Sequence, residues 1–322
     1  MTIIGIDVGG SKLSAAFIHS DGSISHKEKI NLEGSHGDKV CSLILKQIER
    51  LRKLSDTTIS AVGVCVPGIS NQKSGTVWAP NITGWEEYPL MEKIITFLKS
   101  DETTVVIDSD RVCYIAGESW AGAAKDCMDA IYFAIGTGIG AGIMVDGTYL
   151  RGSTGIGGSI GWLAINRPFI PEYGECGSFE YFASGKGITR FAQKLISENQ
   201  GQKSILNVYK NNAHLSTQDV FEAYRQNDAI AVEVLTNCIE FWGMAIADLV
   251  SIFNPEKIIL GGGVFGPAVQ LIDDIYRESL KWAQPVSGSK YSLVVSELGS
   301  DAGLIGAGRI AMMEHEKNRD LA

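Results

Sequence analysis

The stretch Gly5-Ile6-Asp7-Val8-Gly9-Gly10-Ser11-Lys12 joins two apolar segments through a glycine bend. The flanking residues, Ile3 to Val8 and Leu13 to His19, are mostly aliphatic and β-branched, which predicts two strands of a hairpin. Glycines in such a bend let backbone N–H groups approach phosphate oxygens, and the Asp7 carboxylate beside them can hold a magnesium ion. A tight turn explains the glycines as well, and a turn role explains Asp7, so this stretch alone leaves both interpretations open.

The same pattern returns in the middle of the chain. Ala130 to Gly147 reads as a strand, the cluster Gly136-Thr137-Gly138-Ile139-Gly140, a second strand and an Asp-Gly turn, like that at Asp21-Gly22. A third cluster, Gly261-Gly262-Gly263, follows a short predicted strand at Lys257 to Leu260. Three clusters placed directly after strands favour phosphate binding, and the repetition indicates a duplicated chain. Because the first two clusters connect strand to strand, the pattern points away from P-loop NTPases and dehydrogenases.

Composition describes an ordinary globular protein. The chain has 322 residues, of which 45% are hydrophobic and 20% charged, and its net charge is −9. That length suggests about two domains, and the acidic balance argues against a nucleic-acid surface. No continuous run approaches the roughly eighteen apolar residues of a membrane span, and no signal peptide is evident. The six cysteines form no CxxC pair. We expect a cytoplasmic protein with reduced thiols that binds neither nucleic acid nor membranes.

Strands alternate with helices along the chain. Further strands are expected at Ile24 to Ile30, Ile59 to Val66, Val105 to Ile107 and Leu293 to Val295, with helices at Val40 to Leu54, Leu90 to Lys99, Arg111 to Ala124 and Ala229 to Phe253. This order predicts an α/β protein of two related lobes with the active cleft between them. We expect a small N-terminal lobe over residues 1–118 and a larger C-terminal lobe over 119–301. A final helix at about 302–322 is expected to pack back on the first lobe.

Two aspartates near the end of a predicted strand are candidates for a catalytic base. Asp110 opens a predicted helix, where a carboxylate can accept a proton from a substrate hydroxyl. Helix capping is the alternative explanation for an aspartate at such a position. Asp108 is the second candidate.

The chain resembles the ROK family of sugar kinases and repressors over nearly its whole length. The resemblance rests on Gly5 to Lys12, Asp108 to Ala124, Gly136 to Gly142 and Asn254 to Gly263. It implies an actin-like ATPase (ribonuclease H-like) fold, ATP and Mg²⁺ as cofactors, and phosphate transfer to a sugar hydroxyl, usually a primary one. The family motif Glu-Asn-Asp-Ala-Asn, with Leu-Gly-Glu after it, aligns with Asp108 through Glu118. This alignment makes Asp110 the base and gives Asp108 a non-catalytic position.

The resemblance also implies binding residues. The first phosphate motif aligns with Asp7, Gly9, Gly10, Ser11 and Lys12, the second with Gly136, Thr137, Gly138 and Gly140, and the adenosine motif with Gly262 and Gly263. Asp7 is expected to hold Mg²⁺ directly or through water. Gly68, Asn81 and Glu180 align with positions of the sugar site.

The zinc-binding part of the family pattern is altered. Family kinases supply three cysteines and a histidine as ligands, whereas this chain has Pro171, Tyr173, Ser178 and Trp162 at those positions. Cys176 matches no ligand position, and one thiol cannot complete a tetrahedral site. We therefore predict no structural zinc. Packing of four aromatic side chains is expected to hold the loop instead, namely Trp162, Tyr173, Phe179 and Tyr181.

The sugar site departs from the family as well. Where the family motif has an asparagine before the base, this chain has Ser109. The family's Gly-Glu-x-Gly-His segment is replaced by Gly158-Ser159-Ile160-Gly161-Trp162. Losing Asn, Glu and His removes hydrogen-bonding groups near the first two ring positions, which alters substrate choice. Glucose and the N-acetylated hexosamines are thereby less favoured. An amino sugar, a cyclitol or a sugar substituted at its first carbon fits such a pocket, and the residues do not select among them.

The pattern favours an ATP-dependent kinase, a phosphotransferase with an alcohol group as acceptor. The alternative is a catalytically silent relative, either a pseudokinase or a regulator that binds sugar or nucleotide. Repressors of the family carry an N-terminal DNA-binding segment, for which the first strand, expected from Thr2, leaves no room. The intact Asp110 and phosphate glycines favour activity. The resemblance also implies a homodimer formed through the larger lobe.

Overall fold

The computed structural model describes residues 1–32, 34–100, 102–198, 203–210 and 214–321. The chain forms two compact units. The first comprises Met1–Cys127, Gly142–Gly158 and Glu297–Ala322, and the second comprises Met128–Ala141 and Ser159–Ser296.

The first unit is built on a five-stranded sheet. Its strands are β1 (Thr2–Val8), β2 (Lys12–Ile18), β3 (Ile24–Asn31), β4 (Ile59–Val66) and β7 (Thr104–Ser109), in the order β3-β2-β1-β4-β7. β1, β4 and β7 are parallel, whereas β2 and β3 are antiparallel to their neighbours. A short hairpin of β5 (Ile69–Asn71) and β6 (Thr76–Trp78) follows β4. The predicted glycine bend therefore joins β1 to β2.

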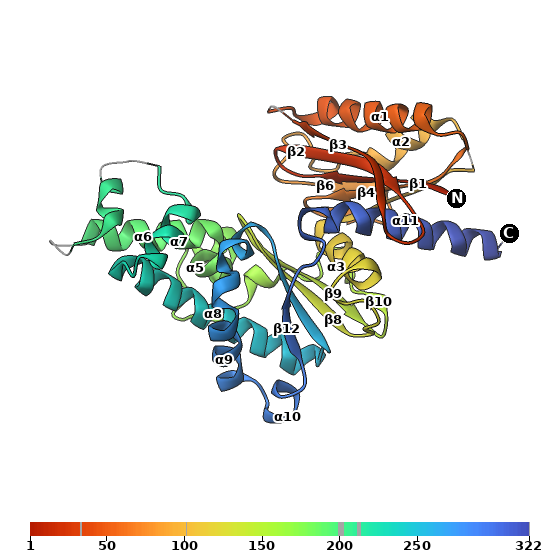
Figure 1. Ribbon diagram of the computed structural model, residues 1–322. Helices are drawn as coiled ribbons and strands as arrows, with labels where there is room; N and C mark the ends of the chain where they lie inside the picture. Colours follow the sequence, from red (N-terminus) through yellow and green to blue (C-terminus); the bar gives the residue numbers. More distant parts are fainter. Residues whose placement is uncertain (33, 101, 199–202, 211–213, 322) are drawn as a thin grey trace. The chain divides into compact units, whose positions relative to one another are not determined.

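Helices cover both faces of this sheet (Figure 1). On one face, α1 (Gly37–Leu54) and α2 (Leu90–Leu98) share a buried apolar cluster with the strands. On the other face, α3 (Asp110–Ala121) and α11 (Ala302–Leu321) form a second cluster with the sheet. Glycine permits the close crossing of these two helices, because a Cβ on Gly306 would lie 1.7 Å from the carbonyl oxygen of Cys113. The last helix thus belongs to the first unit.

The boundary between the units differs from the expected division after residue 118. Helix α3 continues to Ala121, and the segment Gly142–Gly158 belongs to the first unit. Glycine is required at position 142, where the chain re-enters the first unit, because a Cβ there would lie 2.0 Å from the carbonyl oxygen of Arg111. The absence of a side chain at this glycine lets the strand pack directly on the start of α3.

The second sheet repeats the order of the first. Its strands are β8 (Ala130–Ile135), β9 (Ile139–Val145), β10 (Thr148–Tyr149), β11 (Lys257–Gly261) and β12 (Ser292–Val295), in the order β10-β9-β8-β11-β12. β8, β11 and β12 are parallel, as β1, β4 and β7 are in the first sheet. The two sheets thus share one topology, in agreement with the repeated sequence pattern.

Of this sheet, β10 and the second half of β9 lie in the segment Gly142–Gly158 of the first unit, whereas the remainder of the second unit is mainly helical. Its α-helices are α4 (Tyr173–Cys176), α5 (Ser178–Ala183), α6 (Gly185–Glu198), α7 (Thr217–Arg225), α8 (Ala229–Phe253), α9 (Ile272–Trp282) and α10 (Pro285–Gly288). Short 3-10 helices lie at Ile160–Trp162, Ile205–Tyr209, Gly263–Phe265 and Pro267–Leu271, and another in the first unit at Gly299–Asp301.

Helix α8 is long and apolar enough to cross a membrane by length and composition, with a mean hydropathy of 1.4 in its most apolar window. In this structure, 56% of that window is buried. Its buried residues pack with α5, α6, α7 and α9, an arrangement typical of the core helix of a globular unit.

Candidate functional site

The strand register of the first sheet brings two of the predicted aspartates to one row. Asp7 on β1 pairs in register with Cys65 on β4, and Cys65 pairs with Asp108 on β7. All three residues lie at the carboxyl ends of parallel strands, where α/β sheets place their ligands. Asp110 is the first residue of α3, which starts directly after β7. The site in the first unit is therefore built on the carboxyl edge of this sheet.

Ser109, rather than Asp110, caps helix α3. The Ser109 hydroxyl accepts a hydrogen bond from the backbone N–H of Val112 at 3.4 Å, and its backbone is extended. The Asp110 carboxylate accepts only a local bond from the N–H of Arg111, at 2.8 Å, among the bonds described for it. The capping explanation for Asp110 is therefore wrong, and Ser109, expected at the sugar, has its hydroxyl on the helix end.

Asp108 is held in an ion pair. Its side chain is 5% exposed, and its Oδ2 accepts from Nε and a terminal nitrogen of Arg151 at 2.8 and 2.7 Å. Among the residues that the structure describes, no lysine or arginine nitrogen lies within 4.0 Å of the Asp110 carboxylate. The geometry thus distinguishes the two candidates for the base, since a carboxylate engaged by a guanidinium is a poor proton acceptor.

Burial governs the protonation of these groups. It raises the pKa of Asp110, and the positive charge of Arg111 opposes the rise. Burial likewise raises the pKa of Asp108, and Arg151 opposes it. A raised pKa makes Asp110 a stronger base than an exposed carboxylate once it is ionised.

Asp7 fits a cation. Burial raises the pKa of its carboxyl to about 6, while a hydrogen bond from the Cys65 thiol opposes this shift. A carboxylate kept ionised at this position is stabilised by a nearby cation, and oxygen is the ligand that Mg²⁺ prefers. Asp7 is therefore a candidate ligand for Mg²⁺ in the first unit.

Replacing Asp7 by Asn should raise the stability of the metal-free protein at neutral and higher pH. The folded pKa of about 6 exceeds the ordinary value of 3.8, so stability contributed by this group is present at low pH and lost as pH rises through about 6. The gain from Asp7→Asn has an upper bound of about 3 kcal/mol near pH 8. Thermal melts in EDTA from about pH 4 to 8 measure it, and equal melts at about pH 8 would contradict this account.

The first glycine loop lies beside another predicted residue. The Gly9 N–H donates to the carbonyl of Lys12 at 2.8 Å, which closes the bend, and Gly10, Ser11 and Lys12 are exposed. A Cβ on Gly10 would lie 3.6 Å from the Cβ of Asn81. The loop and Asn81 are therefore neighbours on an accessible surface. Gly68 differs, because it is buried and its carbonyl accepts from Arg111 at 3.3 Å.

In the second unit, Glu180 supports the second glycine loop. Its Oε2 accepts from the backbone N–H of Ile139 at 2.7 Å, and a Cβ on Gly138 would lie 2.7 Å from the same oxygen. The loop is closed by a bond from the Gly136 N–H to the Gly138 carbonyl at 2.9 Å. Gly140 lies within β9 rather than in the loop. Glu180, expected at the sugar, thus has one oxygen committed to the loop backbone.

In the third glycine cluster, position 262 requires glycine for two reasons. Gly262 has a φ of +89°, and a Cβ there would lie 2.4 Å from the carbonyl oxygen of Ile135. Gly263 has open space around its Cα, with nothing within 4 Å of a Cβ position. The cluster therefore sits tightly on β8 at one residue and is open at the next.

A pocket of about 510 Å³ joins the second and third clusters. Gly136, Thr137, Gly263 and Val264 line it together with residues at or just before the starts of α6 and α7, namely Gly185, Lys186, Thr189, His214, Leu215, Ser216, Thr217 and Gln218. Lys186 was not predicted as a site residue. The only feature of the sequence that could have indicated it is its position directly after Gly185. A cation among phosphate-loop glycines suits a nucleotide.

Replacing Lys186 by Ala should weaken nucleotide binding by about three- to tenfold, because an exposed cation contributes about 1 kcal/mol to binding a phosphate. Lys194→Ala is the matched control, since Lys194 lies on the same helix and does not line the pocket. Titration calorimetry with Mg²⁺ and a non-hydrolysable ATP analogue measures both variants. Equal affinities of the two variants would show that Lys186 does not contact the nucleotide.

The altered zinc loop is held by aromatic rings. Tyr173 is buried and lies edge-on to Tyr181 and Phe182, with ring centroids 5.3 and 5.8 Å away, and Phe179 is fully buried near Phe133. The packing role predicted for Trp162 is wrong, because this side chain is 56% exposed. Phe182 was not predicted and occupies the centre of the cluster, stacked on Phe241 at 4.7 Å.

Within the described residues, no group of three or more His, Cys, Asp or Glu side chains is placed to hold a metal ion. The aromatic cluster accounts for the order of the loop without one. We expect metal analysis of the purified protein to find no stoichiometric zinc, and stoichiometric zinc would contradict this expectation.

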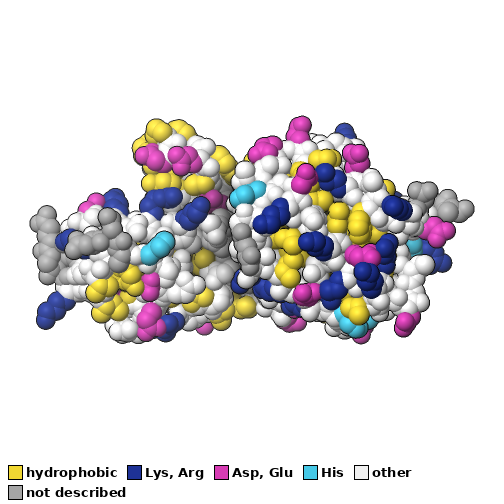
Figure 2. Space-filling model, turned by 90° about the horizontal axis from the view of Figure 1, so that it is seen from above, with side chains coloured by type: hydrophobic (Ala, Val, Ile, Leu, Met, Phe, Trp, Pro, Cys, Tyr) yellow, Lys and Arg dark blue, Asp and Glu magenta, His cyan; other side chains and the backbone are white. Residues whose placement is uncertain are grey.

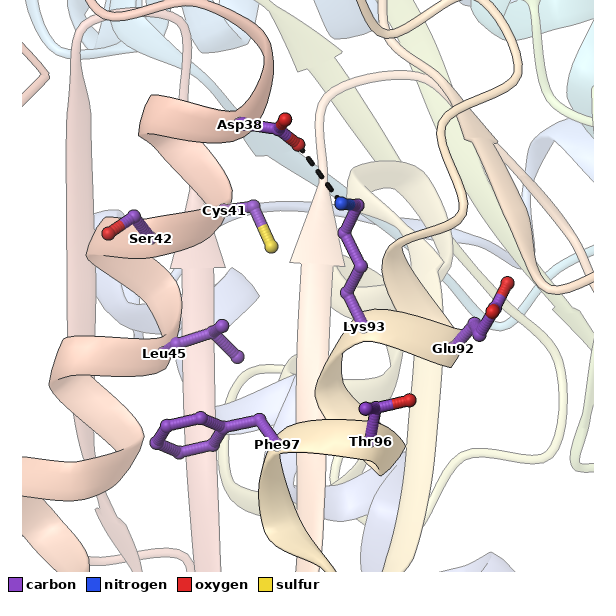
Figure 3. A pocket seen from close by; sticks show the side chains of 8 residues that line it. All are labelled: Asp38, Cys41, Ser42, Leu45, Glu92, Lys93, Thr96 and Phe97. Atoms are coloured by element: carbon purple, nitrogen blue, oxygen red, sulfur yellow. Dashed lines mark ion pairs between the residues drawn. The ribbon is translucent and has the colours of Figure 1, made fainter.

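A further pocket of about 450 Å³ lies between α1 and α2, and no predicted site residue is among those that line it (Figure 3). Asp38, Cys41 and Leu45 line it from α1 and face Lys93 and Phe97 on α2. The ion pair of Asp38 with Lys93 closes one end at 3.1 Å. This pocket lacks the glycine loops and the strand-end carboxylates of the candidate site.

The model of the ROK family matches residues 3–314. The chain belongs to the ROK family. It is 30% identical to a glucokinase of Halalkalibacterium halodurans over 318 residues, which covers 95% of this chain and 93% of that protein. A solved ROK family glucokinase of Streptomyces griseus, in complex with glucose and AMPPNP, superposes with a TM-score of 0.76 at 27% identity, over 97% of this chain and 100% of that one.

These ROK relatives confirm the predicted family and the α/β fold of actin-like ATPases. The ROK family also contains regulators. A xylose repressor of Caldicellulosiruptor bescii is 30% identical over 266 residues, covering 81% of this chain and 65% of the repressor. On the face shown in Figure 2, Lys and Arg side chains are interspersed with Asp and Glu. Among the described residues of that face, the Lys and Arg side chains form no continuous basic patch of the kind that binds DNA.

Proposed function

We propose that this protein is an ATP-dependent kinase that transfers the γ-phosphate to a hydroxyl of a hexose, an amino sugar or a sugar-like cyclitol. The hydroxyl is of the primary, 6-OH type, and Asp110 is the general base. The observation that carries the proposal is the pair of unlike carboxylates at the end of β7, where Asp108 is engaged by Arg151 and Asp110 is not. Membership of the ROK family and the similarity to glucokinases support a phosphotransferase that acts on a sugar hydroxyl.

Each part of the candidate site has a role in this reaction. Asp110 accepts the proton of the acceptor hydroxyl as the hydroxyl oxygen attacks the γ-phosphorus, and the bond from that phosphorus to the β,γ-bridging oxygen breaks, so that ADP leaves. Asp7 would hold Mg²⁺, which when bound neutralises charge on the phosphates. The glycine loops at Gly9 and Gly136 present backbone N–H groups to the phosphates, and Lys186 adds positive charge in the second unit. We expect the protein to act in the cytoplasm and to form a homodimer.

The sugar-site residues make glucose and the N-acetylated hexosamines less favoured as acceptors. Ser109 caps a helix, Glu180 holds the phosphate loop, and Trp162 presents an exposed indole next to Ser159. Fewer polar groups are therefore left to recognise a hexose at its first two carbons, which supports an acceptor that is modified there or lacks the ring oxygen.

The experiment is release of ADP and formation of a phosphorylated product with Mg²⁺-ATP across hexoses, free and N-acetylated amino sugars, sugars substituted at the first carbon, and cyclitols. Stimulation by one acceptor, with equal amounts of ADP and product, supports the kinase and identifies the substrate. Binding of nucleotide or sugar without turnover of any acceptor would instead support the regulator, the function to which the repressor similarity points.

A further inference from the structure

Two arginines connect the catalytic turn of the first unit to one loop, in opposite directions. The catalytic turn is Asp108–Arg111, and the loop is Arg151–Gly158, which follows β10. Arg111 reaches from the helix to carbonyl oxygens of the loop, at Gly157 (3.3 Å) and Gly155 (3.5 Å). Arg151 reaches from the loop to the carboxylate of Asp108 at 2.7 Å. Each segment therefore contributes one guanidinium and receives the other.

The loop is rich in glycine, which makes its backbone flexible when it is not held by neighbouring segments. Three of its glycines have positive φ, namely Gly152, Gly155 and Gly158, so its backbone is one that few other sequences adopt. The Gly157 N–H donates to the Arg151 carbonyl at 2.9 Å, and a Cβ on Gly155 would lie 2.9 Å from the Ser70 carbonyl oxygen. Such a glycine-rich loop loses much conformational entropy when it is ordered, so its external contacts determine its position.

Arg111 also contacts the turn after β4. One terminal nitrogen donates to the carbonyl of Gly68 at 3.3 Å and to that of Gly155. A planar guanidinium offers five donors in a fixed fork, so a single side chain can hold three segments in one arrangement. Arg111 replaces the alanine of the family motif, and alanine can make none of these bonds.

We infer that Arg111 is a positioning residue of the catalytic site: with Arg151 it locks the loop Arg151–Gly158 and the Gly68 turn to the base Asp110. This inference rests on the proposed function, in which Asp110 is the general base and Gly68 belongs to the sugar site. The side chain of Arg111 donates its hydrogen bonds to neutral carbonyls, and Arg151 pairs with Asp108. The two arginines therefore leave Asp110 available as the base. A small displacement of a reacting group costs about a hundredfold in rate.

The test compares Arg111→Ala and Arg111→Lys with the wild type and with Arg277→Ala, an exposed arginine on α9 as control. Backbone hydrogen exchange of residues 152–158 requires no turnover. We expect faster exchange there in Arg111→Ala, a partial effect in Arg111→Lys, and none in Arg277→Ala. With the preferred acceptor, kcat should fall about a hundredfold in Arg111→Ala, with partial rescue by lysine, while KM for ATP stays within about twofold.

Each outcome bears on the inference. Exchange in Arg111→Ala that matches the wild type would overturn it, because the loop would then not depend on Arg111. Faster exchange with unchanged kcat would also overturn it, since Arg111 would be a structural tether only. Faster exchange in a protein that phosphorylates no acceptor supports the lock and shows that the sugar-kinase assignment is what fails.

Discussion

Replacing Asp110 by Asn is expected to lower kcat by about 10²- to 10⁴-fold, the range that a general base contributes. Asparagine has nearly the shape of aspartate and can keep the local bond from the Arg111 N–H, but it cannot take the acceptor's proton. Folding should be preserved, because Asp110 is not the cap of α3 and has no ion-pair partner among the described residues. Removing a carboxylate whose pKa is raised by burial should even stabilise the protein slightly at neutral pH.

The measurement is steady-state turnover of the preferred acceptor, with a thermal melt and nucleotide titration of the same samples. Asp108→Asn is the matched control, two residues away on the same turn. It keeps the proposed base and weakens the bond to Arg151, so we expect kcat to fall less than in Asp110→Asn, and no large loss of stability because burial already disfavours the ionised Asp108. If Asp108→Asn abolishes turnover and Asp110→Asn does not, the assignment of the two carboxylates is reversed.

Local patterns predicted the elements that carry this site. Alternating aliphatic residues and glycine bends predicted β1 and β2 to within a residue, at Ile3 to Val8 and Leu13 to His19 against Thr2–Val8 and Lys12–Ile18. The final turn of α3 was overestimated, because Gly122 ends the helix, whereas helical spacing alone extends it to Ala124. The repeated pattern around the second glycine cluster predicted a duplicated sheet order, since strand and turn signals are local.

Contacts between distant segments were not predictable in the same way. Arg151 pairs with Asp108 from 43 residues away, and Lys186 joins the glycine pocket from a helix that the sequence described only as part of a helical half. The assignment of Ser109 as the cap and Asp110 as the first helical residue depends on backbone angles that two adjacent polar residues do not reveal. Trp162 was predicted to be buried because it is a large aromatic residue in the altered zinc loop. Its side chain is exposed instead.

Replacing Glu118 by Ala is expected to destabilise the protein more than any surface change, because this carboxylate is fully buried and accepts bonds from two segments. Its Oε2 accepts from the Ala123 N–H at 2.8 Å, just after α3, and its Oε1 accepts from the Leu298 N–H at 3.1 Å, just before α11. Glu118 lies on the helix that begins with Asp110, so it secures the far end of the helix that carries the base.

Alanine at position 118 leaves these backbone donors without their acceptor and opens a cavity. Each unsatisfied buried donor costs about 1–3 kcal/mol, so the two together cost about 2–6 kcal/mol and the Tm falls by about 10 °C. Glu118→Gln should lose less, because one amide oxygen can still accept while the amide nitrogen cannot. Glu316→Ala, an exposed position on α11, is the control and should stay within about 0.5 kcal/mol. Denaturant melts rank the four proteins, and a Glu118→Ala variant as stable as Glu316→Ala would show that the two segments are held by other contacts.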